Sequence, residues 1–209
     1  MSKYEFKKFP IIPTILSLLA IIAGVFAISF SLISGNGNAA LSLLIIIAGV
    51  LIFAGLTIGK PTMLRVLSLI ISICIMLANF VLTIIRYNTH DIYLFAAALL
   101  MLIASVLAFI YSLVANKIQR IKTMHFITSI TLISLTGLYA VLYVVNDVVK
   151  AVSVENYALQ SGFYPLLLGY ILVTALPVFV VRSMSLKEAK PVEPEPLSEP
   201  QVEEEKPQE

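Results

Sequence analysis

Six long apolar runs, all free of charged residues, dominate this sequence. None contains Lys, Arg, Asp, Glu or His, and they cover residues 11–33, 39–58, 66–85, 92–115, 126–146 and 163–181. An α-helix needs about 20 mostly apolar residues to cross the hydrocarbon core of a bilayer. The pattern therefore predicts an all-α fold, an integral membrane bundle of six transmembrane helices.

Composition excludes an ordinary soluble domain. Hydrophobic residues make up 59% of the chain and charged residues only 12%, whereas about 25% is usual for soluble proteins. The apolar runs follow one another too closely to leave room for a separate domain. We predict a basic N-terminal segment at 1–10, a membrane domain at 11–182 and a tail at 183–209.

The basic residues predict how the bundle is oriented. Alternate loops place twelve of the fourteen Lys and Arg residues on one side and only Arg86 and Lys150 on the other. Because positive loops stay in the cytoplasm, we predict a multi-pass protein of the cell membrane with both ends cytoplasmic. A cleaved signal peptide is the alternative for the first span, but its 23 residues exceed the usual apolar core of about 7 to 15.

The tail differs from the rest of the chain in composition. Residues 183–209 hold five of the ten prolines, and eight of the twelve acidic residues lie at or after Glu188. Low hydrophobicity and repelling carboxylates predict disorder. The tail is either a solubilising appendage or a docking segment for a cytoplasmic protein partner.

No motif in the chain identifies a reaction. Ionisable groups at bilayer depth mark proton carriers, voltage sensors and intramembrane proteases, and the spans have none. Cys74 is the single cysteine, and the predicted topology puts His90 and His125 at opposite ends of the bundle, with His125 solvated at the interface. We therefore predict no enzyme activity, no metal or other cofactor and no nucleic-acid partner.

The fifth span carries a polar stripe. Ser129, Thr136 and Tyr143 recur every seven residues, so they share one helix face that should contact protein rather than lipid. Interhelical hydrogen bonding explains this stripe without a ligand. A second set of aromatic and amide residues gathers in the predicted outer half of the membrane domain, where an interfacial tyrosine belt is the explanation without a ligand. The alternative is an outward-facing pocket whose candidate ligand-binding residues are Asn79, Tyr139, Tyr143, Asn146, Tyr157 and Tyr164.

Small residues predict sites of close helix packing. Ala23 and Ala27 lie one turn apart in the first span, and Gly55 and Gly59 form a Gly-x-x-x-Gly pair. Such spacing lets helix backbones approach within one chain or between chains. It therefore fits both internal packing and self-association.

These features leave two functions open. The first is a non-enzymatic membrane protein that acts by association with itself or with a partner, surrounded by membrane lipids. The second is a small-solute-binding or transport subunit. In outline the six spans, the chain length and small residues such as Ala23 and Ala27 resemble the substrate-capturing subunits of energy-coupling-factor vitamin transporters, a resemblance of topology without a substrate motif.

Overall fold

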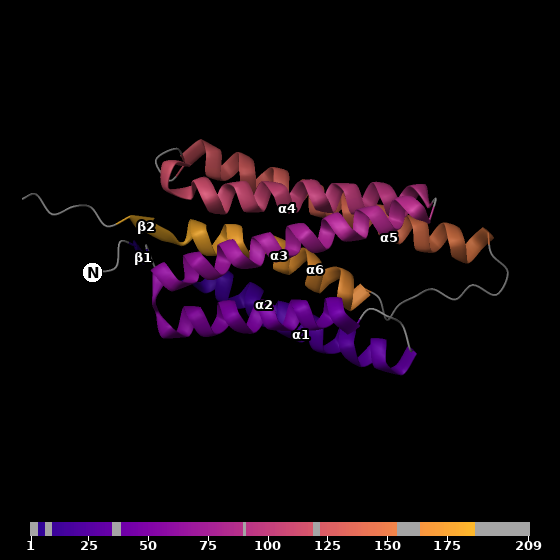
Figure 1. The fold of residues 1–209 in the computed structure, drawn as a ribbon, viewed down its shortest axis with the longest axis horizontal. Helices are drawn as coiled ribbons and strands as arrows, with labels where there is room; N and C mark the ends of the chain where they lie inside the picture. Colours follow the sequence, from indigo (N-terminus) through magenta and orange to yellow (C-terminus); the bar gives the residue numbers. More distant parts are fainter. Residues whose placement is uncertain are drawn as a thin grey trace, which may run out of the picture.

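The computed structural model describes residues 4–6, 10–34, 39–89, 91–118, 122–153 and 164–186. Six long helices occupy most of these residues (Figure 1). Their bounds are α1 Ile11–Ser34, α2 Ala39–Ile58, α3 Pro61–Asn88, α4 Ile92–Ile118, α5 Lys122–Ser153 and α6 Tyr164–Arg182. All six are long and apolar enough to cross a membrane, which confirms the predicted all-α membrane bundle.

Two helices extend well beyond the predicted apolar spans. α3 begins at Pro61, a residue suited to the first helical turn because its fixed φ and missing N–H cost nothing there. α5 continues to Ser153 through Asn146, Asp147 and Lys150. Hydropathy marks only the lipid-facing length of a helix, and these polar turns continue the hydrogen-bonded helix past it.

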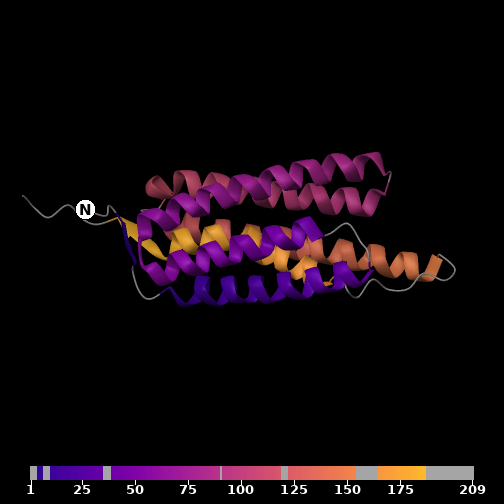
Figure 2. The ribbon, with the colours of Figure 1, turned by 60° about the horizontal axis from the view of Figure 1, so that its bottom comes forward.

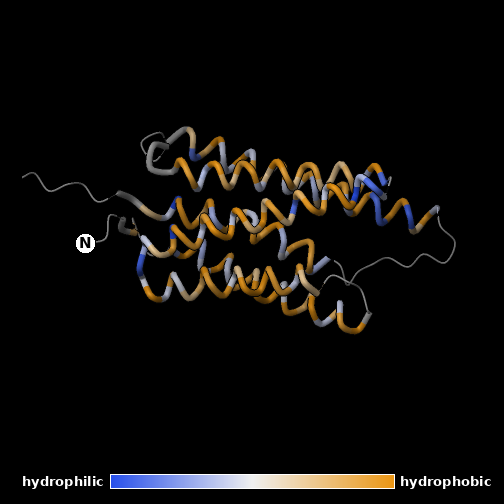
Figure 3. The backbone as a smooth tube through the Cα atoms, in the orientation of Figure 1, coloured by the Kyte–Doolittle hydropathy of each residue, from blue (hydrophilic) through white to orange (hydrophobic). Residues whose placement is uncertain are grey.

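Consecutive helices run antiparallel, and α6 lies in the middle of the bundle (Figures 1 and 2). It packs against α1, α3 and α4, while α5 lies mainly on α4 and touches α6 only lightly. Val173 and Leu176 of α6 are fully buried. Apolar positions predominate along the helices, and the most hydrophilic ones lie mainly toward their ends (Figure 3).

A short β-ladder joins the segment before α1 to the segment after α6. Strand β1 (Tyr4–Phe6) pairs antiparallel with β2 (Met184–Leu186), and the side chain of Met184 is buried. We predicted disorder from Ser183 onward, and β2 differs because its backbone bonds to β1 while Met184 fills the core. The rest of the tail, from 187, lies outside the described residues.

We call the end of the bundle that carries this β-ladder the ladder end. The other end, where α3 meets α4, is the turn end.

Small residues bring α1, α2 and α6 into close contact. A Cβ built on Gly49 would lie 2.8 Å from Ile21 Cγ1 and 3.1 Å from the carbonyl oxygen of Ser17. One built on Gly169 would lie 3.3 Å from the Cβ of Ala23. Ala23 therefore belongs to a tight contact between α1 and α6.

The other predicted packing residues have different surroundings. Ala27 is buried, and a Cβ on Gly55 would meet Leu64 of α3 at 3.1 Å. Gly59 differs from the prediction: its φ of 70° places it in the left-handed region, and nothing lies within 4 Å of where its Cβ would be. It ends α2, since glycine adopts this conformation without strain.

His125 also differs from its predicted solvated position. Its side chain is buried in α5, where Nδ1 shares a hydrogen bond with the hydroxyl of Tyr111 of α4. Ser129, one turn further along α5, accepts a 3.2 Å hydrogen bond from Nη1 of Arg182. Burial of Ser129 and Thr136 confirms that the polar face of α5 is turned to protein.

Candidate functional site

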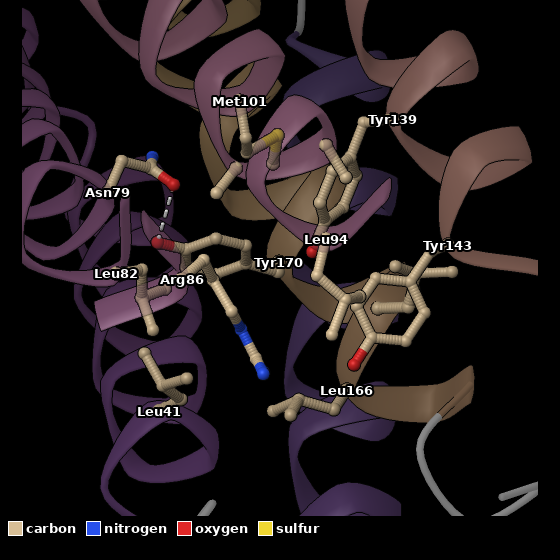
Figure 4. A pocket seen from close by; sticks show the side chains of 13 residues that line it. Leu41, Asn79, Leu82, Arg86, Leu94, Met101, Tyr139, Tyr143, Leu166 and Tyr170 are labelled. Atoms are coloured by element: carbon tan, nitrogen blue, oxygen red, sulfur yellow. Dashed lines mark hydrogen bonds between the residues drawn. The ribbon is translucent and has the colours of Figure 1, made fainter. Parts of the chain in front are cut away.

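A cavity of about 60 Å³ lies inside the bundle toward the turn end (Figure 4). It is bounded by side chains from α2, α3, α4, α5 and α6. The lining residues are Leu41, Asn79, Leu82, Arg86, Leu94, Ala97, Ala98, Met101, Tyr139, Tyr143, Leu166, Leu167 and Tyr170. The walls are thus mostly apolar, with a few polar groups, which is the usual character of small-molecule sites.

Asn79 and Tyr170 form the deep polar part of the cavity. The hydroxyl of Tyr170 donates a 3.0 Å hydrogen bond to Asn79 Oδ1, and both side chains are buried, with exposed fractions of 1% for Asn79 and 4% for Tyr170. The amide nitrogen Nδ2 of Asn79 has no hydrogen-bond partner among the described residues. Because an unpaired buried donor costs about 1–3 kcal/mol, this amide is suited to a partner that enters the cavity.

Arg86 lies two turns further along α3, about 10 Å nearer the turn end along the helix axis. Its side chain is half-buried, and its end lies between Leu41 and Leu166 (Figure 4). Within the described part of the chain, Arg86 forms no ion pair. It is therefore a cation in the wall of a mostly apolar cavity.

Two tyrosines of α5 form the opposite wall (Figure 4). Tyr139 and Tyr143 are one turn apart, with ring centroids 6.1 Å apart and ring planes inclined by 60°. Tyr139 is 8% exposed, and its hydroxyl makes no hydrogen bond to any described residue. Arg86 and the Tyr139 hydroxyl thus join Asn79 Nδ2 as polar groups without a bonded partner along one cavity.

The carboxylates near the turn end are engaged elsewhere. Asp91 Oδ2 accepts a 2.6 Å hydrogen bond from Lys150 Nζ, and its Oδ1 accepts one of 3.2 Å from the backbone N–H of Leu94. Burial raises the pKa of Asp91, but these bonds and the charges of Lys150 and Arg86 outweigh it and lower the pKa below its ordinary 3.8. Asp91 is therefore an anion that is already neutralised by Lys150.

The predicted ligand-binding residues fall into three groups. Asn79, Tyr139 and Tyr143 line the cavity. Asn146 is buried but does not line it, and Tyr164 instead donates a 2.8 Å hydrogen bond to Asp147 Oδ2. Tyr157 lies outside the described residues.

Sequence reasoning missed Tyr170 and Arg86 as cavity residues. Tyr170 lies in an apolar run, and its partner Asn79 is 91 positions away, so no local pattern joins them. Arg86 was treated only as a loop charge. Its position two turns after Asn79 on one helix, and hence on the same face, is the signal that links it to the site.

The described residues offer hydrogen-bond donors rather than a metal centre. Among them, no group of three His, Cys, Asp or Glu side chains is placed to hold a metal ion. Comparison of the chain with protein-family models, with characterised proteins and with solved structures finds no match. The site is therefore interpreted from its own geometry, and the outline resemblance to vitamin-transporter subunits gains no further support.

Proposed function

We propose that this multi-pass membrane protein binds a small solute in the cavity between α3, α4, α5 and α6, without performing a chemical reaction on it. The observation that carries the proposal is Asn79 in the cavity wall, a buried amide whose Nδ2 has no hydrogen-bond partner among the described residues. Buried polar groups in folded proteins are almost always hydrogen-bonded. A bound solute, or the water that it displaces, would supply the missing hydrogen-bond partner.

The volume of the cavity limits the size of the ligand that it can hold in this conformation. About 60 Å³ holds a few water molecules or one small group, and drug-sized ligands occupy roughly 300–1,000 Å³. A larger ligand would require the wall that bears Tyr139 and Tyr143 to move outward, and α5, which packs mainly on α4, touches α6 only lightly. The proposed ligand is therefore small, or it enters as α5 shifts.

The side from which the solute enters follows from the charge distribution. Most Lys and Arg residues belong to the ladder end and its loops, so the positive-inside rule favours a cytoplasmic ladder end. The cavity would then open toward the outside of the cell membrane. We propose uptake or sensing of an external solute, whereas self-association and docking through the tail remain predictions from the sequence.

Cysteine accessibility tests the proposal without knowledge of the ligand. In a Cys74→Ser background, Ala98→Cys places a thiol at the cavity and Ala108→Cys places one in the closed core of the same helix. Thiols react as thiolates, which need water, so 2-sulfonatoethyl methanethiosulfonate should modify the first variant and spare the second. Equal inertness of both variants would mean a sealed cavity and would refute solute binding there.

A further inference from the structure

The polar groups still available in the cavity are hydrogen-bond donors. Asn79 Oδ1 is occupied by the Tyr170 hydroxyl, so the remaining Asn79 amide nitrogen can only donate. The guanidinium of Arg86 has N–H donors and no acceptor, and a tyrosine hydroxyl donates readily. A ligand that satisfies Asn79, Arg86 and Tyr139 must therefore bring acceptor atoms.

The charge of Arg86 restricts the ligand further. Removing a cation from water is costly unless a counter-charge accompanies it. Arg86 is half-buried, and the neighbouring carboxylate of Asp91 is bonded to Lys150 at 2.6 Å. An amine ligand would meet a like charge in the cavity wall, whereas an anion would supply the ion pair that Arg86 lacks among the described residues.

Apolar walls and a single cation favour a singly charged ligand. Leu82, Leu94, Leu166 and Met101 surround the space between Arg86 and the deep amide. A phosphate dianion would leave an unbalanced negative charge against these walls. A carboxylate matches the one positive charge and accepts two parallel hydrogen bonds from a guanidinium.

Building on the solute-binding function proposed above, we infer that the cavity takes a small monocarboxylate with an apolar body. Its carboxylate lies at Arg86, and its apolar part lies among the leucines and Met101. The donors of Asn79 and Tyr139 accommodate a second acceptor on the same molecule or a bound water. The carboxylate belongs either to a free solute or to a fatty acid from the bilayer, two sources with the same recognition chemistry.

Binding to the full-length protein in bilayer nanodiscs tests this inference. The probes are pentanoate and dodecanoate, each compared with the primary amide and the amine of equal chain length. We expect a carboxylate to bind most tightly. Arg86→Gln should weaken that binding at least about tenfold and Tyr139→Phe about two- to tenfold, whereas Arg65→Gln, at the other end of α3, should leave it unchanged.

The outcomes separate the ligand class from the function. Saturable pentanoate binding identifies a free solute, and binding of dodecanoate alone identifies a fatty acid. The Tyr139→Phe variant lacks only one oxygen atom and should fold. If the amides bind as tightly as the carboxylates to both wild type and this variant, the carboxylate assignment is wrong, although solute binding stands. The assignment also fails if neither carboxylate binds while Ala98→Cys is reactive. If Ala98→Cys is inert as well, both proposals fail.

Discussion

The hydroxyl of Tyr170 in α6 and the side-chain oxygen of Asn79 in α3 are joined by a 3.0 Å hydrogen bond in the interior of the bundle. The bond connects the central helix to α3 and fixes which way the amide faces. Since the oxygen of Asn79 is engaged, its nitrogen, which has no partner among the described residues, is the donor that this side chain still offers. One interhelical contact thus contributes to the packing of the bundle and to the chemistry of the site.

A double-mutant cycle on this pair measures its contribution to stability. Tyr170→Phe removes the donor and Asn79→Ala removes the acceptor, and hydrogen bonds between membrane helices contribute about 0.6 kcal/mol on average, with a maximum of about 1.7. We expect a coupling free energy in this range from reversible unfolding in mixed micelles. Strictly additive effects of the two substitutions would show that the contact does not stabilise the bundle.

The close approach of α1 and α2 predicts opposite effects for the same substitution at two helical glycines. Gly49→Ala would force its Cβ against Ile21 and the backbone oxygen of Ser17, and we expect a loss of about 1–3 kcal/mol of unfolding free energy, as for other overpacked sites. Gly137 has no atom within 4 Å of a built Cβ. There, alanine should stabilise α5 by up to about 1 kcal/mol through helix propensity.

Both glycine variants are compared with wild type in the same unfolding assay. The contrast matters more than either value, because each substitution brings the same gain in helix propensity. Equal stability of Gly49→Ala and Gly137→Ala would contradict the close contact between α1 and α2.

Asp91 predicts a loss of stability in acid. Its pKa in the folded protein lies below the ordinary 3.8, so its stabilising effect is fully present above that value and is lost as pH falls through the lowered pKa. Because the pair with Lys150 is partly exposed, with side-chain exposures of 38% for Lys150 and 16% for Asp91, we expect no more than about 1 kcal/mol.

Unfolding measured between neutral pH and about pH 3 tests this expectation. The range ends below the ordinary pKa of a free Asp carboxyl. Asp91→Asn should flatten the acid branch of the stability profile, and Lys150→Met should reduce it as well, since the same pair is broken from the other side. An acid branch of equal steepness in wild type and Asp91→Asn would show that another carboxylate is responsible.

The bounds of the helices could be predicted where the signals that set them are local in the sequence. The α1 and α2 spans were predicted to within a residue because burial in hydrocarbon and turn-forming loops act locally along the chain. The start of α3 at Pro61 was missed, because Arg65 interrupts the apolar signal without breaking the helix. Contacts between distant residues were the harder part.

The site shows the same division. Asn79, Tyr139 and Tyr143 stood out as polar residues in apolar spans, and all three line the cavity. Asn146 has the same chemistry and the same helix face, yet it is buried without lining the cavity, and spacing along one helix cannot tell these two surroundings apart. Likewise, small residues in α1 indicated close helix packing but not which helix is the partner: a Cβ on Gly24 would lie 2.7 Å from Ile46 of α2.

Access of external solutes to the cavity depends on the predicted orientation of the bundle, with the turn end outside the cell. Tyr87 is 66% exposed at the turn end, and Lys60 is exposed between α2 and α3 at the ladder end. In a Cys74→Ser background, a membrane-impermeant maleimide applied to intact cells should label Tyr87→Cys, whereas Lys60→Cys should be labelled only after permeabilisation. The reverse pattern would turn the cavity and Arg86 toward the cytoplasm, so that any solute bound there would come from inside the cell.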